Sequence, residues 1–143
     1  MTVAAILSEK GHDTITAGKD ALLSEVCQTL ATHKIGAVVV CKGDKIIEGI
    51  ISERDIVRVV GTQGPSALDL PVTKVMTKEV ITCSSESSVD EVMAQMTKGR
   101  FRHVPVVKDN KLVGVISIGD VVKFKIAQVE HEAEQMRSYI TMA

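Results

Sequence analysis

The sequence predicts an α+β protein made of two βαββα repeats related by pseudo-two-fold symmetry, with an N-terminal helix and an extended C-terminal helix. The first observation is a duplicated decapeptide: GIISERDIVR at Gly49–Arg58 returns as GVISIGDVVK at Gly114–Lys123, with five of ten positions identical. The second is an apolar pattern spaced i, i+3, i+4, i+7, which indicates an amphipathic helix in each half. The third is a set of continuous apolar runs, such as AVVV and GIIS, typical of strands covered on both faces. We interpret the chain as a tandem duplication.

The first repeat is predicted from its helix pattern and its turn. The apolar helix face consists of Leu23, Val26, Cys27 and Leu30. The polar sequence CKGDK interrupts the apolar residues and predicts a turn at Lys42–Lys45 between two strands. The expected order is a strand at 13–16, a helix at 20–33, strands at 36–41 and 46–51, and a helix at 52–61.

The second repeat follows at an offset of 65 or 66 residues. Gly99 comes directly after its helix pattern and predicts the C-terminal end of that helix. The dipeptide Asp109-Asn110 predicts a hairpin turn. The apolar helix face consists of Val89, Val92, Met93 and Met96. The expected order is a strand at 80–82, a helix at 86–98, and strands at 102–107 and 111–117.

The division of the chain follows from these repeats. The segment Gly61–Thr77 contains Gly64, Pro65 and Pro71 and little periodicity, so we interpret it as the connector between the repeats. We therefore expect a first repeat at residues 1–62, a connector at 63–77, and a second repeat with the C-terminal helix at 78–143.

Composition excludes several classes of protein. The chain has 143 residues, of which 45% are apolar and 24% charged, with a net charge of −1, and this is the balance of a folded domain without a global basic field. We therefore expect no nucleic acid as partner. The longest apolar stretch, Ile35–Cys41, has seven residues against the about 20 that span a bilayer, and no secretion signal is present, so we expect no membrane insertion. The three cysteines lack CxxC spacing, which favours the cytoplasm.

Each repeat carries a Ser-x-x-Asp motif at an expected strand-to-helix junction, namely Ser52–Asp55 (SERD) and Ser117–Asp120 (SIGD). One interpretation is a capping box, in which the serine and the carboxylate satisfy free backbone N–H groups. The other is a nucleotide site, because a helix N-terminus attracts phosphate and a carboxylate can accept both hydroxyls of a ribose. Two such helix ends around a shared cleft favour a ligand site, and capping and binding can coexist.

These repeats resemble the tandem CBS-domain pair, a family named after cystathionine beta-synthase and also called the Bateman module. The resemblance covers nearly the whole chain. It rests on the pattern Gly-h-h-(Ser/Thr)-x-x-Asp, where h is apolar, at Gly49–Asp55 and Gly114–Asp120, and on His103–Val107 (HVPVV), which is similar to the family's h-P-h-h strand. The first repeat departs from that strand pattern, with Val39 where proline is usual. The resemblance implies binding of adenosine-containing ligands (AMP, ADP, ATP, S-adenosylmethionine or NAD(H)) in clefts between the repeats.

The resemblance also implies four kinds of nucleotide-binding position: aspartates that hold the ribose, serines that contact phosphate or ribose, threonines on the adenine side, and strand backbone that reads the edge of the base. Because both repeats keep the serine and the aspartate, two sites are expected, and they are expected to differ in ligand or affinity. The implied aspartates are Asp55 and Asp120, the serines are Ser52 and Ser117, and the threonines are Thr16 and Thr82. The implied strand backbone is that of Ala37, Val38, His103 and Val104 with the adjoining Pro105.

A phosphate group needs a cation, and the sequence offers two sources. One is Arg54, beside the first motif, and the other is the basic cluster Lys98, Arg100, Arg102 and His103 that enters a strand of the second repeat. Alternate residues of a strand share a face, so Arg100 and Arg102 would lie together, and arginine binds phosphate oxygens bidentately. The alternative is a solvated edge that protects the strand from aggregation. We take Arg54 and Arg102 as the phosphate-binding candidates.

Other chemistries find little support in the sequence. His33, His103 and the cysteines have no metal-ligand spacing. Ser52, Ser117 and Cys41 lack a sequence-local base, and no P-loop or GxGxxG motif is present. We therefore expect no metal site, no catalytic residue and no catalytic cofactor.

The C-terminal residues form a heptad pattern. From Val122 the apolar residues are spaced 4, 3, 4, 3 and 4, which amounts to under three heptads. This helix either folds back on its own lobe or pairs with a second subunit, through the same helix or through the first helix, Val3–Leu7. CBS pairs commonly assemble as dimers, and we expect a homodimer. The seam residues are Val122, Ile126, Val129, Ala133, Met136 and Ile140.

The sequence thus predicts a stand-alone, non-catalytic regulatory module that binds an adenine nucleotide and signals to an unknown partner protein. One alternative is a structural dimerisation module whose motifs only cap helices. Another is an enzyme that acts on nucleotides, for which the sequence shows no nucleophile, metal or base constellation.

Overall fold

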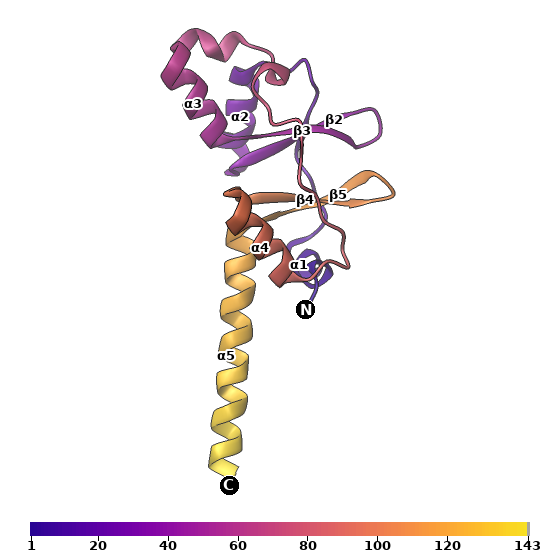
Figure 1. The fold of residues 1–143 in the computed structure, drawn as a ribbon, viewed down its shortest axis with the longest axis vertical. Helices are drawn as coiled ribbons and strands as arrows, with labels where there is room; N and C mark the ends of the chain where they lie inside the picture. The colour runs from indigo at the N-terminus through magenta and orange to yellow at the C-terminus, as the bar shows by residue number, and fades with distance from the viewer. Residues whose placement is uncertain (143) are drawn as a thin grey trace.

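The computed structural model describes residues 1–142 and shows two lobes stacked on each other, with one long helix extending away from them (Figure 1). The predicted α+β class, with two repeats and a helix at each end of the chain, is confirmed. The elements are α1 (Val3–Lys10), β1 (Thr16–Ala17), α2 (Leu23–His33), β2 (Ala37–Lys42), β3 (Ile46–Ser52), α3 (Glu53–Gln63), the short 3₁₀ helices η1 (Pro65–Asp69) and η2 (Val72–Lys74), α4 (Val89–Gly99), β4 (His103–Lys108), β5 (Lys111–Ser117) and α5 (Ile118–Met142).

The two lobes contain corresponding β-hairpins. β2 pairs antiparallel with β3, with Ala37 opposite Ser52, and β4 pairs antiparallel with β5, with His103 opposite Ser117. In the first lobe β1 adds to the hairpin in parallel, which gives the strand order β1-β2-β3. α3 and α5 each begin directly after the last strand of their hairpin. The first Ser-x-x-Asp motif therefore lies beside the start of β2, and the second lies beside the start of β4.

The strand expected at residues 80–82 is not formed, and that prediction is wrong. A single parallel bridge joins Cys83 to Val106 instead. The chain turns directly after this bridge, where the Ser87 amide donates to the Ser84 carbonyl at 3.1 Å, and before it Val80 and Ile81 line a cavity instead of pairing in a sheet.

The first elements of the first repeat are shorter than predicted. β1 covers two residues rather than the range 13–16, and α2 starts at Leu23 rather than at residue 20. The residues before α2 are held by the connector, because the Ala21 carbonyl accepts a hydrogen bond from the Val72 amide at 2.7 Å. These backbone groups are therefore satisfied outside the helix, which begins only after them.

The end of α4 differs from its predicted form. Gly99 is the last helical residue, and the next residue, Arg100, takes the left-handed conformation with φ 57°. Lys34 does the same after α2, with φ 54°. A side chain at Gly99 would collide with the ring of Phe101. Glycine is therefore required at this position to leave space for the Phe101 ring, and the left-handed turn is formed by Arg100 instead.

Each lobe has its own apolar core, and the N-terminal helix belongs to the core of the second lobe. Val3, Ile6 and Leu7 of α1 are buried against residues of α4, β4 and β5, and Figure 1 shows α1 beside α4. Val72 of the connector is buried in the core of the first lobe. The packing thus joins segments across the predicted domain boundaries at residues 62 and 77. These boundaries themselves stay a prediction.

The glycine that opens each duplicated decapeptide is required because another segment crosses it. A Cβ atom at Gly49 would lie 2.5 Å from Met76 Sδ and 2.8 Å from the Thr77 carbonyl oxygen. A Cβ atom at Gly114 would lie 2.7 Å from Leu7 Cδ2. The connector therefore covers β3 in the same way that α1 covers β5.

The C-terminal helix begins at Ile118, earlier than the seam residue Val122. Val121 is buried, and Ile118 and Phe124 pack against the core of the second lobe. Beyond this point α5 extends away from both lobes (Figure 1). Of the two interpretations of this helix, packing on its own lobe therefore applies only to its first two turns.

Candidate functional site

A cavity of about 520 Å³ lies between the two lobes, a volume typical of small-molecule sites. The first lobe provides the start of β2, the end of β3 and the first turns of α3. The second lobe provides the segment from the end of α4 to the start of β4, and Thr77, Glu79, Val80 and Ile81 of the linking chain form a further wall. The first Ser-x-x-Asp motif faces this cavity.

Ser52 and Asp55 form the capping box that was one interpretation of the motif. The Asp55 amide donates to Ser52 Oγ at 3.3 Å, and the Ser52 amide donates to Asp55 Oδ2 at 2.9 Å. The Ser52 hydroxyl also donates to Oδ2, at 3.0 Å. Capping therefore uses one carboxylate oxygen, and Oδ1 has no hydrogen-bond partner among residues 1–142. The geometry makes capping compatible with a ligand at the same aspartate.

Positive side chains outnumber negative ones in the lining of the cavity. Two arginines come from successive turns of α3, and two come from the segment before β4. Within the described chain, none of the four guanidinium groups has a carboxylate within ion-pair distance. They are therefore available to an anionic group, for which arginine forms bidentate hydrogen bonds. The charged lining residues are Arg54, Arg58, Arg100, Arg102, Glu53, Asp55 and Glu79.

His103 lies where the two lobes meet. A Cβ atom at Gly36 would lie 3.2 Å from His103 Cε1 and 3.6 Å from Glu53 Oε1. Burial lowers the pKa of His103 below its ordinary value of 6.5, the charge of Lys10 lowers it further, and the carboxylates of Glu53 and Asp120 oppose the shift. The imidazole is therefore neutral at neutral pH. It can exchange hydrogen bonds with a ligand, but the arginines must supply the positive charge.

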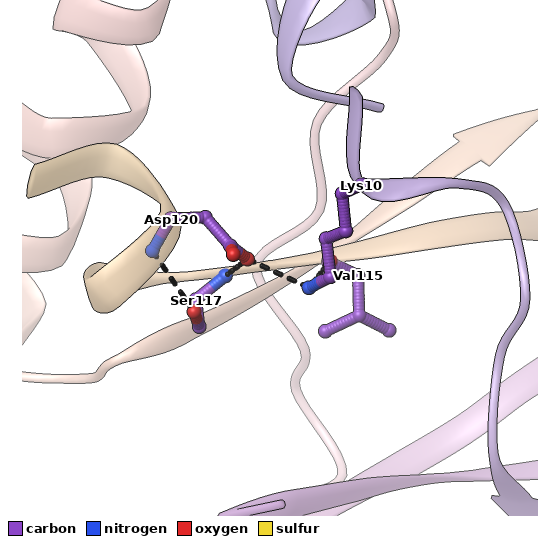
Figure 2. Close-up of polar contacts among 4 residues, drawn as sticks. All are labelled: Lys10, Val115, Ser117 and Asp120. Atoms are coloured by element: carbon purple, nitrogen blue, oxygen red, sulfur yellow. Dashed lines mark hydrogen bonds and ion pairs between the residues drawn. The ribbon is translucent and has the colours of Figure 1, made fainter. Parts of the chain in front are cut away.

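The second motif caps its helix in the same way, but a lysine also binds its carboxylate. The Ser117 amide donates to Asp120 Oδ2 at 2.9 Å, and the Asp120 amide donates to Ser117 Oγ at 3.1 Å. Lys10, the last residue of α1, donates from Nζ to the same Oδ2 at 2.6 Å and to the Val115 carbonyl at 2.7 Å (Figure 2). The ammonium group thus occupies the carboxylate expected to hold a ribose.

The environment keeps Asp120 ionised. Burial alone would raise the pKa of Asp120, but hydrogen bonds from Lys10 and Ser117 outweigh it and hold the pKa below its ordinary value of 3.8. A second polar group lies in the segment that follows α1: Thr14 Oγ1 is buried without a hydrogen-bond partner among the described residues. At the repeat offset of 66, Thr14 corresponds to Val80, which lines the first cavity.

The structure brings together six of the residues that were predicted to bind a nucleotide. They come from both lobes, so the shared cleft inferred from the repeat is present. These six residues are Ala37, Ser52, Arg54, Asp55, Arg102 and His103.

The other predicted residues lie outside this cavity. Ser117 and Asp120 lie against Lys10, and Thr16 and Thr82 are absent from the lining. The three remaining residues, Val38, Val104 and Pro105, are buried in the strands, and the Pro105 carbonyl already accepts a hydrogen bond from the Cys83 amide at 3.0 Å.

Sequence reasoning missed several residues at the cavity. Arg58 could have been found, because it follows Arg54 by four residues and therefore shares its helix face. Val80 and Ile81 were expected in a strand, but they form a wall of the cavity instead. No local pattern indicates that wall. Lys10 was also missed, because a contact across 110 residues has no local signal.

Two further findings concern the part of the chain that the structure describes. It contains no group of three His, Cys, Asp or Glu residues placed to hold a metal ion, and no helix long and apolar enough to cross a bilayer. Its three cysteines, Cys27, Cys41 and Cys83, are free thiols. Burial raises the pKa of Cys83 to about 11. That thiol therefore stays protonated and weakly nucleophilic at neutral pH.

The fold and the repeated motif agree with a comparison against known families. The model of the CBS domain matches residues 3–62 and residues 72–127, one match for each repeat. The chain therefore belongs to the CBS-domain family, as a tandem pair.

Similar proteins share this arrangement. CBS domain-containing protein CBSX3, mitochondrial, from Arabidopsis thaliana is 33% identical over 97% of this chain and 71% of its own length. The chain spans only 20–23% of longer Arabidopsis relatives that it matches. The crystal structure of the CBS-domain containing protein ATU1752 from Agrobacterium tumefaciens is 47% identical, with a TM-score of 0.85 over 87% of this chain and 99% of that one.

A further similar structure contains ligands. The CBS domain pair of protein MJ0100 was solved in complex with 5′-methylthioadenosine and S-adenosyl-L-methionine. It is 26% identical to this chain, with a TM-score of 0.80 over 90% of this chain and 98% of that one.

Proposed function

We propose that this chain is a non-catalytic regulatory module that binds an adenosine-containing ligand, such as AMP, ADP, ATP or NAD(H), in the cleft at Ser52–Asp55. The observation that carries the proposal is the cavity lined by both lobes, which combines a half-used carboxylate at a helix N-terminus with four arginines. The complex of MJ0100 with two adenosine derivatives supports the chemical class of the ligand.

Each part of such a ligand has a suitable group in the cleft. The free oxygen of Asp55 accepts hydrogen bonds from ribose hydroxyls, and the Ser52 hydroxyl lies beside it. Arg54 and Arg102 bind phosphate oxygens. Val80 and Ile81 offer an apolar wall to the adenine ring, a kind of surface that nucleotide sites commonly use together with a few polar groups.

We propose a second, weaker site at Ser117 and Asp120. Lys10 must leave the Asp120 carboxylate before ribose hydroxyls can bind there, so part of the binding energy is lost to breaking that ion pair. The unpartnered Thr14 hydroxyl gives a ligand one further group to bind. Thr16 and Thr82 on the adenine side, and the strand backbone at Val38, Val104 and Pro105, remain part of this proposal.

Signalling follows from the position of the cleft. A ligand that contacts both lobes stabilises one relative orientation of the lobes, and it shifts the population only by its difference in affinity between orientations. The partner that reads this orientation is a separate protein. We further propose that the chain is a homodimer, supported by the exposed apolar side of α5, and that it acts in the cytoplasm, supported by its free thiols.

The experiment that tests the ligand proposal is a thermal-shift panel of AMP, ADP, ATP, NAD, NADH and S-adenosylmethionine, followed by calorimetry to obtain the stoichiometry. A ligand at 100 times its Kd adds about 2.7 kcal/mol to the free energy of unfolding, which corresponds to several degrees. We expect a selective shift with one class of nucleotide. Recovery of the unchanged nucleotide after incubation distinguishes binding from turnover.

A second candidate function is a dimerisation module without ligand. The observed capping boxes favour it, because they give Ser52, Asp55, Ser117 and Asp120 a structural task of about 1 kcal/mol for each helix. No thermal shift with any nucleotide of the panel would support this candidate over the first.

A further inference from the structure

The free part of α5 is a helix without a protein surface to cover it. Lys125 forms an ion pair with Asp90 at 2.9 Å, and within the described chain no later residue of α5 forms an ion pair with the lobes. The helix continues through residues 126–142, about 25 Å at 1.5 Å per residue, and Figure 1 shows it pointing away from both lobes. Most of the stability of a helix in a protein comes from packing of its apolar side, so the exposed apolar side of this segment favours a partner.

The apolar side of this segment is a continuous seam. The exposed fractions are 53% for Ile126, 59% for Val129, 61% for Met136 and 67% for Ile140, with Ala133 between them. Their alternating spacing of three and four residues keeps the seam on one side when two helices wind around each other. Ile126, Ala133 and Ile140 take heptad position a, and Val129 and Met136 take position d.

The charges beside the seam specify the direction of the partner helix. In a parallel coiled coil, each g residue meets the e residue of the next heptad on the other helix. Glu132 at g then meets Arg137 at e of the second copy, which gives two attractive pairs in the dimer. An antiparallel pairing that covers the whole seam instead places Glu132 opposite Glu132 and Glu130 opposite Glu130. Charge complementarity therefore favours the parallel arrangement.

We propose that α5 pairs with the α5 helix of a second copy as a parallel, in-register, two-stranded coiled coil. This inference rests on the proposed homodimer and does not depend on the ligand. It places both CBS pairs at the same end of the coiled coil, each joined to it directly through the helix that carries the Ser117–Asp120 motif.

The first test is sedimentation equilibrium of Met136→Glu, with His131→Glu as the matched control on the outer side of the same helix. We expect a dimeric parent, a monomeric Met136→Glu variant and a dimeric control. A monomeric parent would overturn both the homodimer and the coiled coil. A dimeric Met136→Glu variant would overturn the coiled coil alone, because the dimer then forms through another surface.

The second test determines the direction of the helices by oxidation of Ala133→Cys. In a parallel, in-register pair this a position faces itself, so we expect a disulfide-linked dimer on a non-reducing gel. His131→Cys, at the outer position f, should give no more cross-linking than the parent, which carries the same three native thiols. If Ala133→Cys remains at the parent level while the protein is dimeric, the parallel register is wrong and the homodimer stands.

The third test exchanges the charges. Glu132→Arg and Arg137→Glu should each weaken dimerisation by about three- to tenfold, because each replaces two attractive pairs with repulsive ones. The double variant restores both pairs in the parallel arrangement and should recover the affinity of the parent. Additive losses in the double variant would overturn the proposed pairing.

Discussion

The two Ser-x-x-Asp motifs have the same local structure but different surroundings. In both, the serine and the aspartate cap the helix with nearly equal hydrogen bonds. Around the first motif, the Ile50 carbonyl accepts the backbone amide of Thr77 at 2.9 Å, and Asp55 faces the cavity. Around the second, the equivalent Val115 carbonyl accepts the side chain of Lys10, which also neutralises Asp120.

The difference comes from the segment that covers each hairpin. The connector crosses β3 and satisfies it with backbone groups, whereas α1 crosses β5 and ends in a lysine. A duplicated motif therefore does not imply duplicated sites. The same carboxylate is open to a ligand in one lobe and paired with a cation in the other.

The largest expected effect is that of Asp55→Asn on nucleotide binding. The amide still accepts the hydrogen bond from the Ser52 backbone, so the cap is kept, but the charge that attracts the ribose hydroxyls is lost. We expect affinity to fall by more than about tenfold in calorimetry, the size of a lost hydrogen bond to a charged group. Asp120→Asn is the matched control and should bind within about twofold of the parent. Equal affinity of both variants and the parent would show that Asp55 does not hold the ribose.

The next effect concerns stoichiometry, and Lys10→Met tests it. Removing the ammonium group frees the Asp120 carboxylate, so calorimetry should report two sites per chain where the parent shows one at moderate ligand concentration. Stability should change by no more than about 1 kcal/mol, because Lys10 is partly exposed. Lys19→Met, an exposed lysine outside the motif, is the control. Two equal sites in the parent itself would contradict the masking by Lys10.

A smaller effect is expected for Arg102→Met. Arg102 occupies the position that corresponds to Gly36 in the first repeat, so only one of the two lobes carries an arginine there. The substitution should weaken binding of ATP by about fivefold, an effect of about 1 kcal/mol, and leave binding of adenosine unchanged. Arg137→Met on the free part of α5 is the control. Equal losses for ATP and adenosine would show that Arg102 does not act through phosphate.

The smallest effect is the dependence of stability on pH. The folded pKa of His103 lies below 6.5, so when the pH falls below 6.5 the unfolded chain binds a proton that the folded chain does not. The free energy of unfolding should therefore decrease as the pH falls from 6.5 towards 5, and His103 should contribute no pH dependence above that window. His103→Gln should reduce this slope in denaturant titrations, whereas His33→Gln should keep it. Identical slopes in all three proteins would contradict a buried, neutral His103.

Much of the fold was predictable because its signals are local. The helix faces of α2 and α4, the two hairpins and both caps are visible as spacings of a few residues. The strand at 80–82 failed as a prediction because an apolar segment that lines a cavity has the same composition as one that pairs in a sheet. Six residues that line the cavity, near the motifs and on the neighbouring strands, could be predicted from the sequence. The wall at Val80 and Ile81 could not.

The sequence by itself determined that there are two repeats, that each contains amphipathic helices, and that the helix after each hairpin starts with a serine and an aspartate. It did so because periodicity and capping depend on residues within one or two turns of each other. Only the tertiary structure decided that α1 packs in the second lobe, that Lys10 binds Asp120, and that the open cavity adjoins Asp55. These facts depend on which segment crosses which strand, and such contacts join residues as far as 110 positions apart, for which no spacing in the chain provides a signal.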